Sequence, residues 1–401
     1  VWRPPADSKA SAKAGRARRV LPHERSGLPT SVSDIASPCI AHLDLDAFYV
    51  SVELARRPHL RGLPVVVAGR SPRAVVTTAS YEARRFGVFS ATPAARARRL
   101  CPEAVFVEPD FAAYRARSRE VMAILREEID RVETVGLDEA YLDLSDLERP
   151  ATAARRLKAT VRERTGLGCS IGLGPNKLVA KVASDADKPD GFVSLSAAEA
   201  SRRFGGEPPG LLPGIGPKTA ARLASLGIDT LDRLAAASEA DLSGWFGPRL
   251  GRALGRLARF EDDRSLELAR TAKSESRETT FPADLRGVPA LLPALEQLAR
   301  ELCGRLQTQG RAGRTVGIKV RLDDFSTHTR ARTLREPTND AGVVGSVAGE
   351  LLRCFDPPRP VRLLGVRVAG LDAGGVDDAR RGPGDFGQLA LSLAEPGVAR
   401  P

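Results

Sequence analysis

Two short acidic motifs, far apart in the sequence, carry the side chains best suited to chemistry. Asp44-Leu45-Asp46 follows the apolar run 39–43, and Asp138-Glu139 opens a stretch that alternates apolar and polar residues. In an extended strand Asp44 and Asp46 share one face. Mg²⁺ prefers oxygen ligands, and two such ions about 3.5–4 Å apart can stabilise a phosphoryl transfer. Taken alone, however, each motif is more typical of a chance match or a solvated strand end than of a metal site.

The composition indicates that any catalysis depends mainly on carboxylate side chains. The 401 residues include four His and five Cys, without a Cys-x-x-Cys pair, which argues against a histidine triad and a zinc site. The net charge of +11 favours a polyanionic partner, with nucleic acid ahead of an anionic membrane. No apolar run reaches the ~18–20 residues that span a bilayer. We therefore expect no membrane association, reduced thiols and a cytoplasmic location.

The pattern of apolar residues predicts strands and helices that do not alternate strictly, which is typical of an α+β fold. We expect strands at 39–43, 64–68, 74–78, 139–144, 169–173, 315–322, 327–334 and 361–368. Helices are expected at 112–131, 151–165, from about 175, at 288–309 and at 340–355. Short helices broken by Gly and Pro fill 196–262, and 262–273 is interpreted as a linker. A chain of this length should form two to four domains.

Six collinear sequence blocks favour a functional role for the acidic motifs over a chance match. They are 44–53 (DLDAFYVSVE), 81–84 (YEAR), 137–143 (LDEAYLD), 170–177 (SIGLGPNK), 181–191 with its DKPDG end, and 212–216 (LPGIG). Together they resemble the Y-family DNA polymerases, in their DNA polymerase IV branch, from about Ile40 to Val368. The resemblance implies a right-hand polymerase with palm, fingers, a helical thumb and a separate α+β little-finger domain.

The same resemblance implies a division of the chain into domains. A basic, disordered N-terminal arm at 1–38 precedes a palm formed by 39–50 and 108–195, with the fingers at 51–107. A thumb with a helix-hairpin-helix motif occupies 196–262, followed by a linker at 263–272 and the little finger at 273–370. A flexible tail at 371–401 contains a clamp-binding peptide at 388–393.

The resemblance also assigns the acidic residues. Asp44, Asp138 and Glu139 are the implied catalytic metal ligands, joined by the backbone carbonyl of Leu45. Two Mg²⁺ ions per active site are implied, with Mn²⁺ able to substitute. Asp46 matches the motif but is not a usual ligand in the family, so we expect it to have a supporting polar role.

Nucleotide contacts are implied for residues of three blocks. Phe48 and Tyr49 follow the metal strand, and Tyr49 resembles the steric gate that excludes a ribose 2′-hydroxyl; the alternative is that both are core aromatics. Tyr81, Arg84 and Lys188 match contacts to the triphosphate, which a guanidinium can bind in bidentate fashion, and Thr78 is a further candidate. The alternative for the arginine pair 84–85 is a solvated helix face.

Contacts with DNA and with a sliding clamp are expected further along the chain. Gly214, Gly216 and Lys218 lie in a glycine-rich turn at a helix start, which suits a DNA phosphate, although a plain helix–helix connection is the alternative. Arg330 and Arg332 are expected to contact the DNA backbone, although alternation alone does not settle which arginines face DNA. The clamp peptide consists of residues that suit an apolar groove, namely Gln388, Leu389, Leu391 and Leu393; a chance apolar cluster is the alternative.

These features predict a DNA polymerase in which the primer 3′-hydroxyl attacks the α-phosphate of a paired dNTP. The resemblance implies distributive, low-fidelity synthesis on primer–template DNA by a monomer, without a proofreading exonuclease, in repair and lesion bypass. A non-catalytic, clamp-bound scaffold is the alternative, and retention of the three carboxylates argues against it. A helix-hairpin-helix nuclease would not explain the blocks at 48–49 and 81–84. Gly136 and Thr92 replace the usual Ser and Met, which leaves the lesion preference open.

Overall fold

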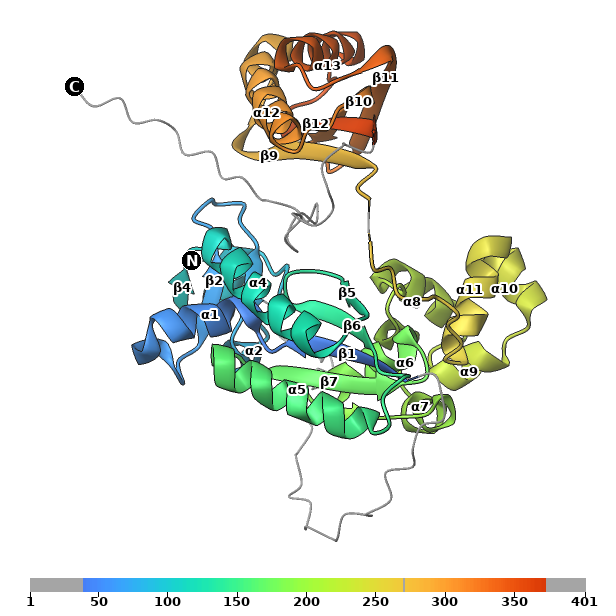
Figure 1. Cartoon of the computed structure of the whole chain (residues 1–401). Coiled ribbons are helices and arrows are strands. Elements are labelled where there is room, and N and C mark those ends of the chain that lie inside the picture. Colours follow the sequence, from blue (N-terminus) through green and yellow to red (C-terminus); the bar gives the residue numbers. More distant parts are fainter. Residues whose placement is uncertain (1–38, 270, 373–401) are drawn as a thin grey trace, which may run out of the picture. The chain divides into compact units, whose positions relative to one another are not determined.

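The computed structural model describes residues 39–269 and 271–372. The predicted basic arm 1–38 and the predicted clamp peptide 388–393 lie outside the described residues. Strands within the described part form sheets of five, three and four strands, accompanied by helices (Figure 1). This mixture agrees with the α+β class predicted from the sequence. None of the helices in these two stretches is long and apolar enough to cross a membrane.

The five-stranded sheet carries the acidic motifs. Its strands are β5 (Val132–Thr134), β6 (Glu139–Asp143), β1 (Ile40–Leu45), β7 (Cys169–Gly174) and β8 (Phe192–Ser194), in that order. The central strand β1 is antiparallel to both β6 and β7. Every residue of β1 is buried, because helices cover both faces of the sheet at this strand. The first acidic motif therefore lies at the end of a fully buried strand.

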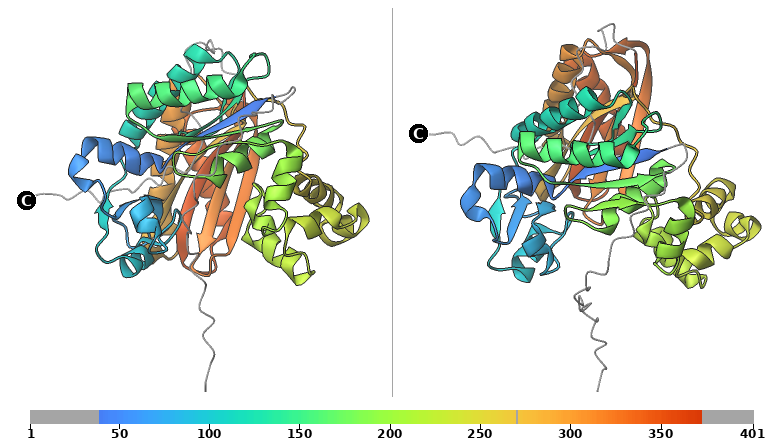
Figure 2. Two further views of the ribbon diagram at one scale, coloured as in Figure 1. Left: turned by 90° about the horizontal axis from the view of Figure 1, so that it is seen from below. Right: turned by 60° about the horizontal axis from the view of Figure 1, so that its bottom comes forward.

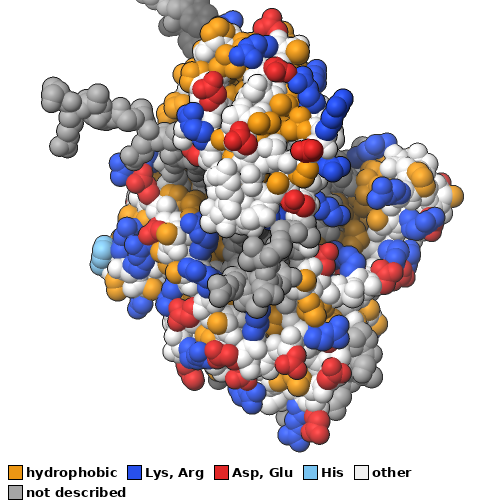
Figure 3. All heavy atoms as spheres, turned by 45° about the horizontal axis from the view of Figure 1, so that its top comes forward, with side chains coloured by type: hydrophobic (Ala, Val, Ile, Leu, Met, Phe, Trp, Pro, Cys, Tyr) orange, Lys and Arg blue, Asp and Glu red, His pale blue; other side chains and the backbone are white. Residues whose placement is uncertain are grey.

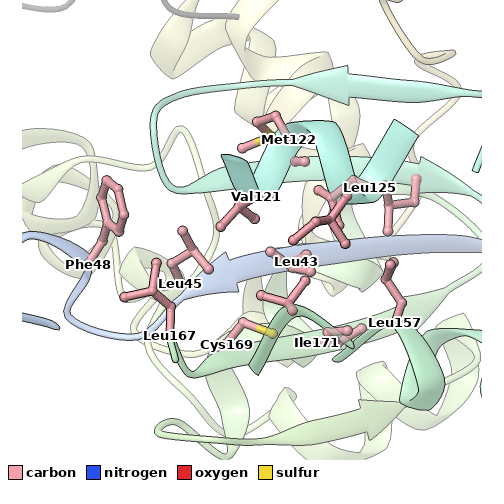
Figure 4. Packing of buried hydrophobic residues seen from close by; sticks show 14 of the residues in the cluster. Leu43, Leu45, Phe48, Val121, Met122, Leu125, Leu157, Leu167, Cys169 and Ile171 are labelled. Carbon is pink, nitrogen blue, oxygen red and sulfur yellow. The ribbon is translucent and has the colours of Figure 1, made fainter. Parts of the chain in front are cut away.

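One face of this sheet packs on α4 (Phe111–Glu128) and α5 (Pro150–Thr165). Figure 4 shows Leu43 and Leu45 of β1 beside Val121 and Leu125 of α4 in this core. Since side chains alternate along a strand, His42 and Asp44 point to the opposite face. That face is covered by α6 (Lys177–Ala186), whose Ser184 hydroxyl lies 2.8 Å from Nδ1 of His42.

Glycine in β7 allows α6 to lie against the sheet. A Cβ atom added at Gly172 would lie 2.1 Å from the carbonyl oxygen of Ala180 and 2.2 Å from the amide nitrogen of Ser184. No real side chain tolerates such distances to backbone, so only glycine fits at this position. The close approach fixes the position of α6, and with it Lys181, above β1.

The remaining elements form three further groups, each with an apolar cluster. The three-stranded sheet is formed by β3 (Val76–Ala79), β2 (Val65–Ala68) and β4 (Val105–Val107). The short helices near it are α1 (Phe48–Arg56), η1 (Pro58–Leu60), α2 (Tyr81–Arg84) and α3 (Ala94–Leu100). The helical stretch consists of α7 (Ala197–Phe204), η2 (Pro209–Leu211), α8 (Pro217–Ser225), α9 (Leu231–Ala236), α10 (Glu239–Phe246) and α11 (Pro248–Ala258). Its apolar side chains pack together with those of α6 and β8.

The four-stranded sheet has the order β11-β10-β12-β9 and is antiparallel throughout. Its strands are β9 (Ser274–Leu285), β10 (Gly313–Leu322), β11 (Thr327–Thr338) and β12 (Val361–Leu371). Figures 1 and 2 show α12 (Val288–Thr308) and α13 (Ala341–Phe355) on one side of it. Val316, Ile318 and Val320 of β10 are buried beneath these helices, and the intervening residues face away from them.

The close contact between α6 and β7 gives a stability prediction. Replacing Gly172 by Ala should lower the free energy of unfolding by about 1–3 kcal/mol, because the methyl group overlaps the α6 backbone. Gly304 in α12 is the matched control, since nothing lies within 4 Å of a Cβ added there. Gly304→Ala should be neutral or slightly stabilising. Denaturant unfolding measures both, and an equal response of the two variants would contradict the packing described.

Candidate active site

The two acidic motifs meet because β1 and β6 are neighbours. Asp44 is the register partner of Glu139 on one side and of Ser170 in β7 on the other. The amide of Leu45 donates to the carbonyl oxygen of Asp138 at 2.9 Å, which ties the second motif to the end of β1. The predicted metal ligands Asp44, Asp138 and Glu139 are thereby brought together at one end of the sheet.

Burial makes this group of carboxylates electrostatically costly. Burial, with the nearby charge of Asp44, raises the pKa of Asp138 to about 6. Burial and a hydrogen bond with Asp44 raise the pKa of Glu139 to about 7. Burial would also raise the pKa of Asp44, but the ammonium groups of Lys188 and Lys181 lower it to about 2. Like charges held this close favour any cation that can enter.

Two lysines supply positive charge at the site. The Lys181 ammonium lies 2.6 Å from Oε1 of Glu139 and 3.1 Å from Oδ2 of Asp44. The Lys188 ammonium lies 2.7 Å from the same Asp44 oxygen and 2.7 Å from Asp185. Burial lowers the pKa of Lys181, but Asp44 and Glu139 outweigh it and raise that pKa above its ordinary value. Both lysines are therefore charged where the carboxylates meet.

Within 39–269 and 271–372, no three His, Cys, Asp or Glu side chains are arranged to hold a metal ion. The carboxylate positions are those of ion pairs with Lys181 and Lys188 rather than of a coordination shell. The donor chemistry nevertheless fits a hard divalent cation, because carboxylate oxygens and a backbone carbonyl are the ligands such ions prefer. The two ammonium groups show that this location already attracts cations.

Asp46 connects the strand end to the surrounding loops. Its Oδ1 accepts a hydrogen bond from the Ser170 hydroxyl at 2.8 Å, and its Oδ2 accepts one from the Asp190 amide at 2.8 Å. The Tyr81 hydroxyl lies 3.5 Å from Oδ1. Asp46 thus links β1, β7 and the loop that carries Lys188.

The two aromatic residues after β1 have different environments. The Phe48 ring is only 2% exposed and belongs to the apolar core beside Leu45, so the expected nucleotide contact by this ring is not supported (Figure 4). Tyr49 is half-buried, and burial together with the charge of Asp138 raises its pKa to about 12. Of this pair, Tyr49 is the side chain that lies close to the carboxylates.

Tyr81 and Arg84 lie together, as their spacing on a helix predicts. The Arg84 guanidinium lies over the Tyr81 ring, 4.4 Å from its centre, and its Nε donates to the carbonyl oxygen of Ala79. Ser80 caps this short helix by accepting from the amide of Ala83. Thr78, at the end of β3, is half-buried. The contact with Asp46 places Tyr81 beside the acidic group.

The two positions that depart from the family pattern lie in different surroundings. Gly136 is buried in the segment between β5 and β6. The Thr92 hydroxyl accepts a hydrogen bond from the amide of Phe89 at 3.2 Å, within the loop before α3. Neither departure removes one of the carboxylates Asp44, Asp138 and Glu139.

The glycine-rich turn has an open surface. Gly214 has a φ of +94°, a conformation that disfavours residues with a side chain, and Gly216 caps the N-terminus of α8. No atom lies within 4 Å of a Cβ added at either glycine. Lys218 is exposed in the first turn of the helix. Open backbone amides at a helix start are suited to binding a phosphate.

Arg330 and Arg332 lie on the side of the four-stranded sheet that carries the helices. They pair in register with the buried residues Ile318 and Val316, and paired residues share a face. The Arg332 guanidinium forms an ion pair with Glu350 of α13 at 2.5 Å, and Arg330 lies over the ring of Phe355. The two arginines expected to contact DNA therefore engage side chains on the helix side of the sheet rather than standing on its open face.

Cations on the open face occupy the intervening strand positions. Lys319 and Arg321 alternate with the buried residues of β10, and Arg367 is the partner of Gly317. Lys319 pairs with Glu278 at 2.8 Å. Figure 3, which displays another side of the molecule, shows Lys and Arg side chains interspersed with Asp and Glu.

Sequence reasoning gave no role to two parts of the site. Lys181 belonged to a quoted block, but its contacts depend on the packing of α6 rather than on local spacing. Tyr114 is fully buried, and its ring stacks on Tyr49 at 4.5 Å from 65 positions away in the chain. The apolar periodicity of α4 marks Tyr114 as a core residue, and no local signal connects it to Tyr49.

Comparison with known proteins agrees with this architecture. Residues 43–185 match the model of the impB/mucB/samB family, and residues 272–381 match the C-terminal domain of that family. Residues 210–262 match a model described as the thumb domain of DNA polymerase-iota. The three matches cover the acidic site, the glycine-rich turn and the four-stranded sheet.

Individual relatives extend over most of the chain. A protein of Streptomyces coelicolor named DNA polymerase IV is 43% identical over 341 residues, which cover 84% of this chain and 71% of the relative. One of Methanoculleus marisnigri with the same name is 42% identical over 345 residues, covering 84% and 96%. The solved structure of a Y-family DNA polymerase chimera, Dbh-Dpo4(243-245)-Dbh, is similar with a TM-score of 0.74 and 28% identity, over 82% of this chain and 98% of that one.

The fold and the site define a Y-family DNA polymerase, as the sequence blocks predicted. Within that family the chain belongs to the DNA polymerase IV branch. It is a DNA-directed DNA polymerase of the translesion type, acting on primer–template DNA and dNTPs. The right-hand α+β fold expected from the sequence is confirmed.

The raised pKa values give a pH prediction for the metal-free protein. Asp138 and Glu139 bind protons more tightly folded than unfolded, since their pKa values rise from 3.8 and 4.5 to about 6 and about 7. Stability should therefore fall as the pH rises from about 4 to about 7. Asp44 acts oppositely, because its pKa of about 2 adds stability that is lost as the pH falls from about 4 towards 2.

Urea unfolding in EDTA at about pH 5 and about pH 7.5 measures this dependence. Asp138→Asn should reduce the loss of stability between the two values by about 1.4 kcal/mol, because it removes one of the two groups. Asp146→Asn changes an exposed residue and should keep the full loss. An unchanged loss in Asp138→Asn would show that this carboxyl group is not held as described.

Proposed function

We propose that nucleotide addition takes place at Asp44, Asp138 and Glu139, with these carboxylates and the Leu45 carbonyl holding divalent cations. The observation that carries the proposal is the meeting of three carboxylates, one buried and two partly buried, with two ammonium groups at one end of the sheet. Mg²⁺ is the expected ion, with Mn²⁺ as a substitute. When bound, such ions polarise phosphate oxygens and stabilise developing charge on attacking and leaving oxygens.

The protein's own residues would then orient the substrates. Lys188 contacts Asp44 across 2.7 Å, so it can turn to a triphosphate once another cation neutralises Asp44. Arg84 and Tyr81 supply a guanidinium and a hydroxyl for phosphate oxygens, with Thr78 nearby in sequence. Tyr49 is the proposed steric gate beneath the sugar. Most of the rate enhancement would come from this positioning and from charge stabilisation.

The domain assignments follow from the same proposal. The five-stranded sheet is the palm and the three-stranded sheet with its short helices forms the fingers, as expected at 39–50, 108–195 and 51–107. The helices of 196–262 form the thumb, which would bind DNA phosphate at Gly214, Gly216 and Lys218. The four-stranded sheet is the little finger, and its open-face residues Lys319, Arg321 and Arg367 replace Arg330 and Arg332 as the proposed DNA contacts.

Further aspects of the function remain proposals drawn from the sequence. Docking on a sliding clamp through Gln388, Leu389, Leu391 and Leu393 concerns a segment outside the described residues. A monomeric state and a cytoplasmic location are likewise expected from the family. The alternative of a non-catalytic scaffold would require the acidic group to be dispensable, which a direct assay can test.

Primer extension tests the catalytic assignment. With Mg²⁺ and all four dNTPs the wild type should extend a primer, and Asp138→Asn should reduce the rate by on the order of 100-fold or more. The exposed residue Asp146 again provides the control, as Asp146→Asn should retain the wild-type rate. A folded Asp138→Asn variant that extends primers normally would place catalysis elsewhere, and a wild type without extension would favour the scaffold.

The salt dependence of DNA binding tests the glycine-rich turn. If Lys218 neutralises one phosphate, Lys218→Ala should make the slope of log K against log salt concentration shallower by about 0.9. Arg156→Ala is the matched control, because Arg156 is an exposed cation of α5, on a different element. Fluorescence anisotropy on primer–template duplex measures both. A slope unchanged by Lys218→Ala, or changed equally by the two variants, would leave the turn as a plain helix connection.

A further inference from the structure

The ring of Tyr49 is supported from within the protein by another aromatic ring. The Tyr114 ring stacks on it with centres 4.5 Å apart and planes 21° from parallel. Phe111 meets both rings edge-on, at 5.9 Å from Tyr49 and 5.8 Å from Tyr114. One face of the Tyr49 ring is therefore covered by a packed layer rather than by solvent.

Tyr114 is held in place by a buried hydrogen bond. Its hydroxyl donates to Oε1 of Glu53 at 2.8 Å, and both residues have no exposed surface. The other carboxylate oxygen of Glu53 lies 3.1 Å from the Arg57 guanidinium, and Arg56 lies 3.6 Å from Oε1. A buried carboxylate needs such partners, because leaving it unpaired would cost several kcal/mol.

Both contacts of Tyr114 are made with residues of one helix, α1. Tyr49 and Glu53 are four residues apart on α1, so they lie on the same side of that helix. Tyr114, on α4, contacts the first through its ring and the second through its hydroxyl. The support of the Tyr49 ring is therefore anchored to the same helix that carries it, so that displacement of either ring disturbs the contacts of the other.

We propose that Tyr114, held by Glu53, is a positioning residue that determines how strongly the polymerase rejects ribonucleotides. The proposal rests on the proposed role of Tyr49 as the steric gate. A ring excludes a 2′-hydroxyl only if it cannot move back when pressed, and close-packed interiors resist such displacement. Neither Tyr114 nor Glu53 needs to touch the nucleotide for this effect.

A purely structural role for this stack makes a different prediction. Loss of packing would lower stability and would affect dNTP and rNTP insertion alike. Loss of a backing ring would instead raise the efficiency of rNTP insertion relative to dNTP insertion. The ratio of kcat/KM for dCTP to that for CTP, opposite a template dG, separates the two roles.

The experiment uses the full chain and four variants of the support. Tyr114→Leu removes the ring together with its hydrogen bond and should lower the dCTP/CTP ratio by about tenfold, mainly through a lower KM for CTP. Tyr114→Phe and Glu53→Leu break the hydrogen bond from its two ends, and each should lower the ratio by about fivefold. Glu53→Gln keeps an acceptor oxygen and should restore the ratio to within about twofold of the wild type.

Two controls make the result specific. Leu302→Ala creates a cavity in α12, in a different apolar cluster from these rings, and should lower the unfolding temperature without changing the ratio. Adding Tyr114→Leu to Tyr49→Ala should lower the ratio no further than Tyr49→Ala alone, since the support acts only through the gate ring. An additional loss in the double variant would contradict the proposal.

The outcomes distinguish the inference from the function on which it rests. If Tyr49→Ala leaves the ratio unchanged, the gate assignment itself fails. If Tyr49→Ala lowers the ratio while Tyr114→Phe and Glu53→Leu keep the wild-type value, only the inference about the support is wrong. Should Tyr114→Leu fail to fold, the decision rests on Tyr114→Phe against Glu53→Gln, which keep the ring and the acceptor respectively.

Discussion

The meeting of three carboxylates at one end of the sheet, with Asp44 buried and Asp138 and Glu139 partly buried, is the constraint on which the rest of this structure depends. Asp44 and Glu139 are cross-strand partners, and Asp138 is tied to the same strand end through its carbonyl oxygen. Such a group is stable only beside positive charge, and Lys181 and Lys188 provide it. In a polymerase of this family the same demand for cations suits the site to metal ions and to the phosphates that accompany them.

The packing around the carboxylates brings positively charged side chains to them. Gly172 lets α6 lie against β7, which brings Lys181 to the carboxylates. Asp46 joins the strand end to the loop of Lys188 and approaches Tyr81. On the opposite face an apolar core fixes β1, and Phe48 belongs to that core. Tyr49, next in sequence, is left between this core and the acidic group.

The sequence was sufficient for features that depend on local spacing. The acidic motifs, most strands of the first sheet, and the pairing of Tyr81 with Arg84 followed from periodicity and from the family blocks. Features set by tertiary packing could not be predicted in this way. The orientation of Arg330 and Arg332 depends on the register of β11 with β10, and the stacking of Tyr49 joins two distant helices. Strand β9 was overlooked because it is an edge strand rich in polar residues.

The central proposal is that Asp44, Asp138 and Glu139 form a cation site, and that the Lys181 ammonium competes with a metal ion for Asp44 and Glu139. Mn²⁺ affinity, measured by electron paramagnetic resonance in the absence of nucleotide, tests it with two variants of opposite expected effect. Asp44→Asn should weaken Mn²⁺ binding because a ligand is lost, whereas Lys181→Met should strengthen it because a competing charge is removed. Unchanged affinity in both variants, or weaker binding in both, would contradict the account.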